Sequence, residues 1–197
     1  MTTIATKPKT IHLSDYQSPA FLISDVQLTV ELGEESTLVT SLLQFKRNGS
    51  DSRQVRLHGE NLVLKNLAVD GVDIPTTEYT LSNTELCFLA PSDNFTAQII
   101  TELKPQENTA LEGLYKSSGN FCTQCEAEGF RKITYFLDRP DVMATFTTTI
   151  IGDADKYPFM LSNGNLDGQG LLSDGRQFFR WVDPHPKPAY LFALVAG

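Results

Sequence analysis

Cysteine is scarce in this chain: three residues among 197, an odd number that does not make a disulfide framework. This scarcity favours a reducing compartment, so we predict a cytoplasmic protein. No apolar run approaches the length of a membrane span, and residues 1–20 lack the continuous apolar core of a secretory signal. We therefore expect no membrane partner.

Basic residues are the minority among the charged ones. The chain has 16 Lys and Arg against 24 Asp and Glu, which gives a formal net charge of −8. Such a charge repels polyanions, and the densest basic spots are only the pairs Lys46-Arg47 and Arg131-Lys132. We therefore expect no nucleic-acid partner.

The motifs of common hydrolases are also missing. The chain has no H-E-x-x-H, no G-x-S-x-G and no phosphate-binding loop. His12 lies near the N-terminus, His58 lies before a glycine, and His185 stands between two prolines. Solvated or structural roles fit these histidines better than general-base roles. We expect no catalytic residue and no metal ligand within this chain.

Alternation of apolar and polar residues, by contrast, is frequent. Val26, Leu28 and Val30 fall on one face with polar residues between them, which is typical of a strand with one buried face. Similar segments recur, separated by turn signals such as Asp70-Gly71. The pattern predicts an all-β fold of antiparallel strands, either a sandwich or a stack of curved sheets, and the length fits one domain or two small ones. The predicted strands are residues 25–32, 37–46, 55–57, 62–69, 79–81, 85–89, 95–103, 142–151, 159–161, 170–172 and 177–182.

The pattern loosens between Lys104 and Asp141. Residues 104–120 carry Pro, Asn and two Gly, and they are predicted to be a long functional loop. Phe130, Ile133 and Leu137 fall at helical spacing, which predicts a short helix ending before Pro140. A proline-rich connection is expected at residues 183–190, before an apolar C-terminal run that suggests a domain excised from a longer chain.

Two cysteines stand three residues apart, at Cys122 and Cys125. With Cys87 or a histidine they could form a structural zinc site, but no second pair of ligands at metal-binding spacing exists. Redox chemistry would place such a pair at a helix start after a strand, in a βαβ unit. Two small thiols beside a tight turn are the favoured interpretation.

Glu126 and Glu128 follow these cysteines in a segment whose neighbours, among them Phe121 and Phe130, are typical of buried sequence. A carboxylate in a partly dry place needs a cation or hydrogen-bond donors to offset its desolvation. The residue types favour an internal cation, supplied by Arg131, Lys132 or Arg139. An external ammonium group is the alternative.

Four segments together resemble one known family. They are "NTALEGLY" (108–115), "FCTQCEAEGFRKITYFLDRPDVMATFTTTI" (121–150), "KYPFMLSNGN" (156–165) and "PKPAYLFALVAG" (186–197). They look like the N-terminal domain of the bacterial aminopeptidase N family, the zinc-dependent gluzincin aminopeptidases. The resemblance runs from about residue 15 to 197 and is dense after residue 105. "FLDRP" (136–140) departs from the wider family, which has Asp-Glu-Pro after a phenylalanine, and points to the bacterial subgroup.

The resemblance implies a saddle-shaped antiparallel β-sandwich that caps a catalytic domain of the same polypeptide. One zinc ion and its H-E-x-x-H motif are expected downstream of this chain, and no cofactor is expected within it. The implied activity is release of N-terminal amino acids from peptides, with this fragment inactive alone. The implied substrate-binding residues are Glu126, which binds the free α-amino group, and Gln124 beside it.

The implied organisation is a flexible segment at residues 1–14 and the β-sandwich domain at residues 15–197. A stand-alone β-sandwich module that binds a carbohydrate or a protein is the alternative. Its contacts would be Trp181 or the loop at residues 104–120.

Overall fold

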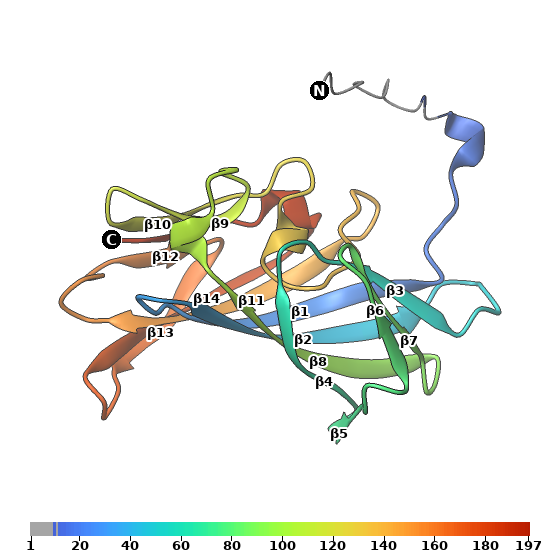
Figure 1. Cartoon of the computed structure of the whole chain (residues 1–197), viewed down its shortest axis with the longest axis horizontal. Helices are drawn as coiled ribbons and strands as arrows, with labels where there is room; N and C mark the ends of the chain where they lie inside the picture. Colours follow the sequence, from blue (N-terminus) through green and yellow to red (C-terminus); the bar gives the residue numbers. More distant parts are fainter. Residues whose placement is uncertain (1–9, 11) are drawn as a thin grey trace, which may run out of the picture.

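The computed structural model describes residue 10 and residues 12–197. The predicted flexible segment at residues 1–14 therefore lies largely outside the described part of the chain. Strands dominate the described part, and its helical structure is limited to four short 3₁₀ turns (Figure 1). None of its helices has the length and apolar character needed to cross a membrane. The predicted all-β class is confirmed. The four turns are η1 (Leu13–Asp15), η2 (Pro105–Glu107), η3 (Phe130–Lys132) and η4 (Ala189–Leu191).

The largest sheet has eight strands in the order β13-β14-β11-β1-β2-β8-β4-β5. All its neighbours run antiparallel except β1 and β11, which are parallel. In chain order its strands are β1 (Phe21–Glu31), β2 (Thr37–Arg47), β4 (Val63–Val69), β5 (Val72–Asp73), β8 (Asn94–Leu103), β11 (Ala144–Asp153), β13 (Asn165–Leu171) and β14 (Arg176–Lys187).

Two smaller antiparallel sheets complete the described structure. One has four strands in the order β12-β15-β10-β9 and the other has three in the order β3-β7-β6. Figure 1 shows the four-stranded sheet at the left and the three-stranded sheet at the right. The strands are β9 (Gly113–Ser117), β10 (Asn120–Gln124), β12 (Met160–Ser162), β15 (Leu194–Ala196), β3 (Gln54–His58), β6 (Tyr79–Leu81) and β7 (Glu85–Leu89).

One face of the large sheet forms the hydrophobic core. Val26 is fully buried and pairs in register with Leu43 on β2 and Phe146 on β11, so their side chains share that face. Both small sheets pack on it. Phe88 of β7 packs edge-on against Phe95 of β8, with ring centroids 6.2 Å apart, and the Trp181 indole of β14 donates a hydrogen bond to the Met160 carbonyl of β12. The buried face predicted from the period-two alternation of apolar residues is therefore confirmed for these strands.

Residues 130–138 fill the space between the two small sheets. The Thr134 hydroxyl lies 2.9 Å from that of Ser41 on the large sheet. Phe136 exchanges two backbone hydrogen bonds with His58 of the three-stranded sheet. The ring of Phe130 packs against Phe192, which lies just before β15, with centroids 5.2 Å apart. This segment therefore ties all three sheets together.

The short helix predicted from Phe130, Ile133 and Leu137 is reduced to the single 3₁₀ turn η3. Every residue from 133 to 138 is buried, including the polar Thr134 and Asp138, so the segment has no exposed face and the spacing of its apolar residues does not indicate a helix. The β-branched and aromatic residues there adopt a more extended path, and Phe136 forms an isolated β-bridge.

The long loop predicted at residues 104–120 is only partly a loop. Its second half is strand β9, which forms a hairpin with β10 through Ser118 and Gly119, both with positive φ. This is the geometry of a two-residue hairpin turn. Most of the proline-rich connection predicted at residues 183–190 is strand. Strand β14 continues to Lys187, which pairs with Ala144 of β11.

Candidate functional site

A tight turn at residues 125–129 begins where strand β10 ends, at Gln124. The Gly129 amide donates a hydrogen bond of 2.8 Å to the Cys125 carbonyl and closes the turn. The peptide bond between Glu126 and Ala127 is cis. Cys125 and Gly129 are buried, whereas the three residues between them are exposed. The turn therefore displays its two glutamates to solvent from a buried base.

Two glycines form that base. A side chain on Gly129 would place its Cβ 2.3 Å from the Gln124 carbonyl oxygen and 2.9 Å from the Gly113 nitrogen. Gly113 has φ +74, and a Cβ there would lie 2.7 Å from the Cβ of Lys132. The start of strand β9 and the end of the turn can lie this close only because both positions lack a side chain.

Glu126 is exposed in this structure. The prediction that its carboxylate lies in a partly buried environment is therefore wrong. Within the described residues, its carboxylate makes no ion pair and accepts no hydrogen bond. Its backbone carbonyl accepts a hydrogen bond of 3.3 Å from the Gln124 side-chain amide. The structure thus brings Gln124 and Glu126 together and leaves the carboxylate available to an external group.

Glu128, two residues further on, does have an internal cation. Its carboxylate lies 3.2 Å from Nη1 of Arg131. The prediction of an internal partner is therefore correct for Glu128 and wrong for Glu126. The other two candidate cations are engaged elsewhere: Lys132 pairs with Glu112, and Arg139 pairs with Asp141 at 2.7 Å.

Arg131 also forms an ion pair with Asp138, whose side chain is only 2% exposed. The Arg131 Nε and backbone amide each donate to Asp138 Oδ2 at 3.1 Å, and Nη2 donates to the Asp138 carbonyl at 3.1 Å. Burial raises the pKa of Asp138 above its usual range, although the bonds from Arg131 oppose that rise. The local sequence does not reveal Asp138 as a site residue, because its neighbours predict a helix rather than a buried charge.

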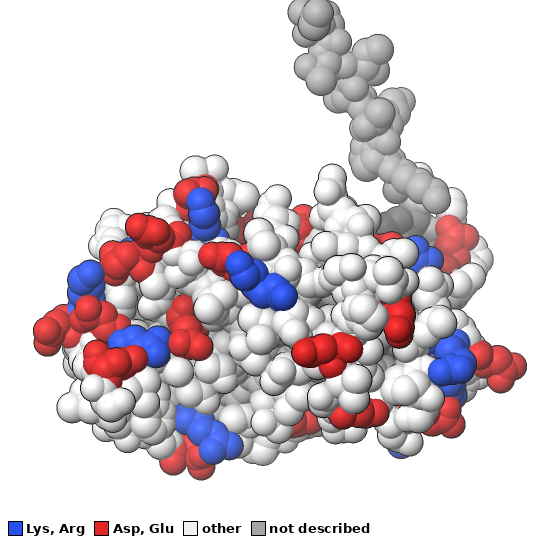
Figure 2. Space-filling model, turned by 60° about the horizontal axis from the view of Figure 1, so that its bottom comes forward, with Lys and Arg blue, Asp and Glu red and all other residues white. Residues whose placement is uncertain are grey.

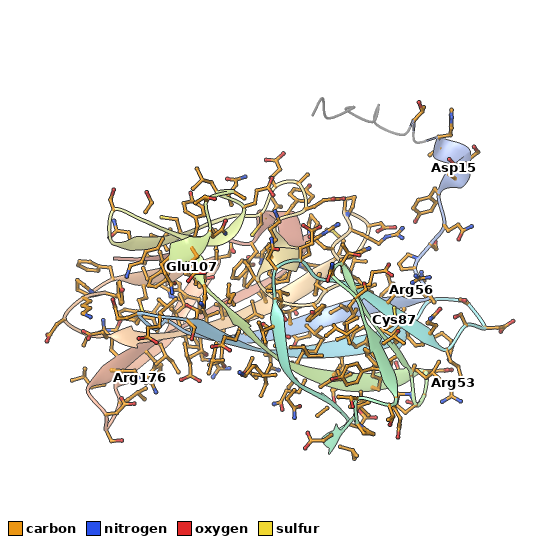
Figure 3. All side chains as sticks on the ribbon, in the orientation of Figure 1. Asp15, Arg53, Arg56, Cys87, Glu107 and Arg176 are labelled. Atoms are coloured by element: carbon orange, nitrogen blue, oxygen red, sulfur yellow. The ribbon has the colours of Figure 1, made fainter. Side chains whose placement is uncertain are left out.

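The cysteines are separated into different environments. Cys125 is buried, and burial raises the pKa of its thiol to about 12, so it is protonated at neutral pH. Cys122 is half-buried on β10, while Cys87 lies on β7 in the three-stranded sheet (Figure 3). No group of three or more His, Cys, Asp or Glu in the described residues could hold a metal ion. The part of the chain that the structure describes therefore has no cluster of side chains that fits a zinc site.

The described histidines lie in different elements. His58 is on β3, where burial and the positive charge of Arg131 lower its pKa. His185 is exposed within β14, and His12 is exposed before η1. Trp181, the candidate sugar-stacking residue, is half-buried and donates a 3.0 Å hydrogen bond to the Met160 carbonyl. An indole held in this way is not an exposed stacking platform.

A cavity of about 440 Å³ lies next to the candidate turn without including its glutamates. It is lined by residues 102–104 and 107–110 and by Asn61, Val63, Leu114 and Lys132. Glu107, labelled in Figure 3, lines this cavity. Acidic and basic side chains are interspersed over the face in Figure 2, without a continuous basic area on that face.

The three sheets define the class of this chain: an all-β domain built from one large sheet and two smaller ones. The model of the peptidase M1 N-terminal domain matches residues 21–191. The chain belongs to that family. The predicted family resemblance is confirmed.

Curated relatives agree in sequence. The chain is 49% identical over 191 residues to aminopeptidase N of Escherichia coli K12, and 44% identical over 192 residues to aminopeptidase N of Haemophilus influenzae. These matches cover 97% and 96% of this chain but only 22% of each relative. The chain thus spans about a fifth of the length of the curated relatives it matches.

Solved structures agree in fold. Aminopeptidase A of Legionella pneumophila, solved in complex with aspartic acid, aligns with a TM-score of 0.89 and 37% identity. That alignment covers 94% of this chain and 22% of the other. The M1 zinc metallopeptidase of Deinococcus radiodurans aligns with a TM-score of 0.79 over 91% of this chain and 43% of its own, and at 16% identity it shows the fold alone.

Proposed function

We propose that residues 15–197 form the N-terminal domain of a cytoplasmic zinc aminopeptidase. The catalytic domain, with one zinc ion, belongs to the remainder of the same polypeptide, and this domain caps it. The whole enzyme releases N-terminal amino acids from peptides, and the isolated chain is inactive. The family membership and the difference in length from the relatives support this proposal.

Within that enzyme, the turn at residues 125–129 contributes to binding the substrate's free α-amino group. Glu126 accepts the α-ammonium, and Gln124 lies beside it in the same pocket. The observation that carries this assignment is the difference between the two glutamates: Glu128 is paired with Arg131, whereas Glu126 has no cation among the described residues. An α-ammonium offers a positive charge and three donors, which is what an unpaired carboxylate recognises best.

Binding the charged end of a peptide gives an aminopeptidase its selectivity. An internal amide or an acylated terminus brings no positive charge to Glu126 and gains no charge-assisted hydrogen bond. Holding the terminus at one point also fixes the position of the first peptide bond relative to the reacting groups. Glu126 is therefore a binding and orienting residue, not an acid or a base.

The test is Glu126→Gln in the complete polypeptide, assayed on a dipeptide with a free amine. Loss of the charge is expected to lower kcat/KM by on the order of 10- to 1,000-fold, with zinc content unchanged. Glu78→Gln is the matched control, because Glu78 is also exposed but lies before β6 in the three-stranded sheet. Full activity of Glu126→Gln would refute the anchor role.

The alternative function is a stand-alone binding module. The coding sequence after Gly197 distinguishes it from the proposed enzyme. A continuation that contains H-E-x-x-H supports the enzyme, whereas a stop codon at that point would refute it. The isolated chain provides a second test: it is expected neither to hydrolyse aminoacyl substrates nor to bind zinc stoichiometrically.

A further inference from the structure

The candidate turn carries two carboxylates, and one arginine reaches only one of them. Arg131 lies three residues after Glu128, and its Nη1 is 3.2 Å from that carboxylate. Glu60 approaches the same nitrogen at 3.8 Å from the loop after β3. The guanidinium therefore connects the exposed turn to neighbouring structure on one side and leaves Glu126 unpaired.

The guanidinium itself is fixed. Its side chain is 12% exposed, and its Nε and Nη2 are both used by Asp138. The Arg131 carbonyl accepts a hydrogen bond of 3.0 Å from the Glu60 amide, which anchors the backbone as well. An arginine held at both its backbone and its side chain has a fixed position, because the planar guanidinium group has few alternative orientations that keep these hydrogen bonds.

We propose that Arg131 is a positioning residue that acts on Glu126 through Glu128. This inference rests on the proposed function of Glu126 as the amine anchor. The buried ion pair with Asp138 fixes the position of Arg131. The ion pair between Arg131 and Glu128, here called the tether, in turn holds the exposed part of the turn. With the tether in place, the Glu126 carboxylate is presented in one orientation before the substrate arrives.

The tether has a modest strength. Glu128 is 68% exposed, so solvent screens its pair with Arg131, and exposed pairs contribute little to overall stability. Its effect on function is larger than its effect on stability because a small displacement of an anchoring group misplaces the reacting bond. The loss therefore appears mainly in kcat, whereas loss of the Glu126 charge also raises KM.

The test is a double-mutant cycle in the complete polypeptide, with a free-amine dipeptide as substrate. Glu128→Gln is expected to lower kcat/KM about three- to tenfold, mainly through kcat, with an unchanged unfolding midpoint. In a Glu126→Gln background, the same substitution is expected to change kcat/KM less than about twofold, because the residue it positions has lost its charge. Additive effects would mean that Glu128 does not act through Glu126.

Asp167→Asn is the matched control. Asp167 forms an exposed pair with Arg180 at 3.5 Å on edge strand β13, and its loss is expected to leave kcat and KM unchanged. Arg131→Lys keeps the charge but not the fork, so it is expected to reproduce the Glu128→Gln defect. Wild-type kcat in Arg131→Lys would overturn the role of the arginine.

The outcomes separate the two proposals. If Glu126→Gln retains full activity, the proposed function fails and this inference fails with it. If Glu126→Gln loses activity while Glu128→Gln behaves like the Asp167→Asn control, the amine anchor stands and the positioning role of Arg131 is overturned alone.

Discussion

The Gly129 amide donates a 2.8 Å hydrogen bond to the Cys125 carbonyl, and this bond closes the turn that displays Glu126. The bond joins two buried residues across three exposed ones. Its geometry depends on the glycine, because the Gly129 Cα faces the backbone of Gln124 and Gly113 at distances that exclude a side chain. The position of Glu126 therefore depends on a residue with no side chain of its own.

Gly129→Ala is expected to destabilise the chain by about 1–3 kcal/mol, the usual cost of overpacking a dense site. The new Cβ would meet backbone atoms, which move less readily than a flexible side chain. Urea denaturation of the 197-residue chain measures the change as a lower midpoint with an unchanged slope. Gly168→Ala is the control, because its Cβ would come no closer than 4.0 Å to Phe178. Equal midpoints for the two variants would contradict the packing argument.

The Cys125 thiol is expected to resist alkylation at neutral pH. Its burial raises its pKa to about 12, so the reactive thiolate is almost absent, and its side chain is covered. Cys87 and Cys122 are only half-buried and are expected to react first. Iodoacetamide labelling of the folded chain, followed by peptide mapping, gives the order. Urea-unfolded chain is the control, in which all three sites are expected to react. Labelling of Cys125 in the folded chain at the rate of Cys87 would refute its protection.

His58 is expected to make the fold less stable at mildly acidic pH. Burial and the charge of Arg131 lower its pKa in the folded chain below 6.5, whereas Asp138, Glu85 and Glu128 oppose this shift. Well above pH 6.5 both states hold a neutral imidazole. As the pH falls from 6.5 towards the folded-state pKa, the unfolded chain takes up the proton first, and stability is lost.

This pH dependence is checked by urea midpoints at pH 7.5 and 5.5. His58→Gln is expected to show a smaller fall in midpoint than the wild type, because it removes the titrating group. His185→Gln, which changes an exposed histidine, serves as the control and is expected to follow the wild type. A fall of equal size in His58→Gln would assign the pH dependence to other groups.

The strands of the large sheet were predictable because one of its faces is wet. In β1, buried Val26, Leu28 and Val30 alternate with more exposed residues, so the period of two is visible in the sequence. Segment 130–138 lies between three sheets and has no wet face, so its spacing wrongly predicts a helix. The spacing of apolar residues predicts secondary structure only where one face of the element is exposed to solvent and the other is buried.

The candidate site was predictable only in part for a similar reason. The segment around Gln124 and Glu126 was found from local residues and from its family resemblance. The packing of Gly129 against Gly113 joins the end of the turn to the first residue of strand β9, 16 positions earlier in the chain, and no local pattern predicts it. Local sequence does show the two-residue turn at Ser118-Gly119, a hairpin signal that the loop prediction overlooked.

Gln124→Ala in the complete polypeptide is expected to lower kcat/KM about three- to tenfold, less than Glu126→Gln. The Gln124 amide is neutral, and its 3.3 Å bond to the Glu126 carbonyl holds backbone rather than the carboxylate. A neutral hydrogen bond contributes about 1 kcal/mol, whereas a bond to a charged group contributes about 1.5–3 kcal/mol. Parallel kinetics of both variants on one free-amine dipeptide rank the two residues. A larger loss in Gln124→Ala would reverse the assignment and make the glutamine the principal contact of the α-amino group.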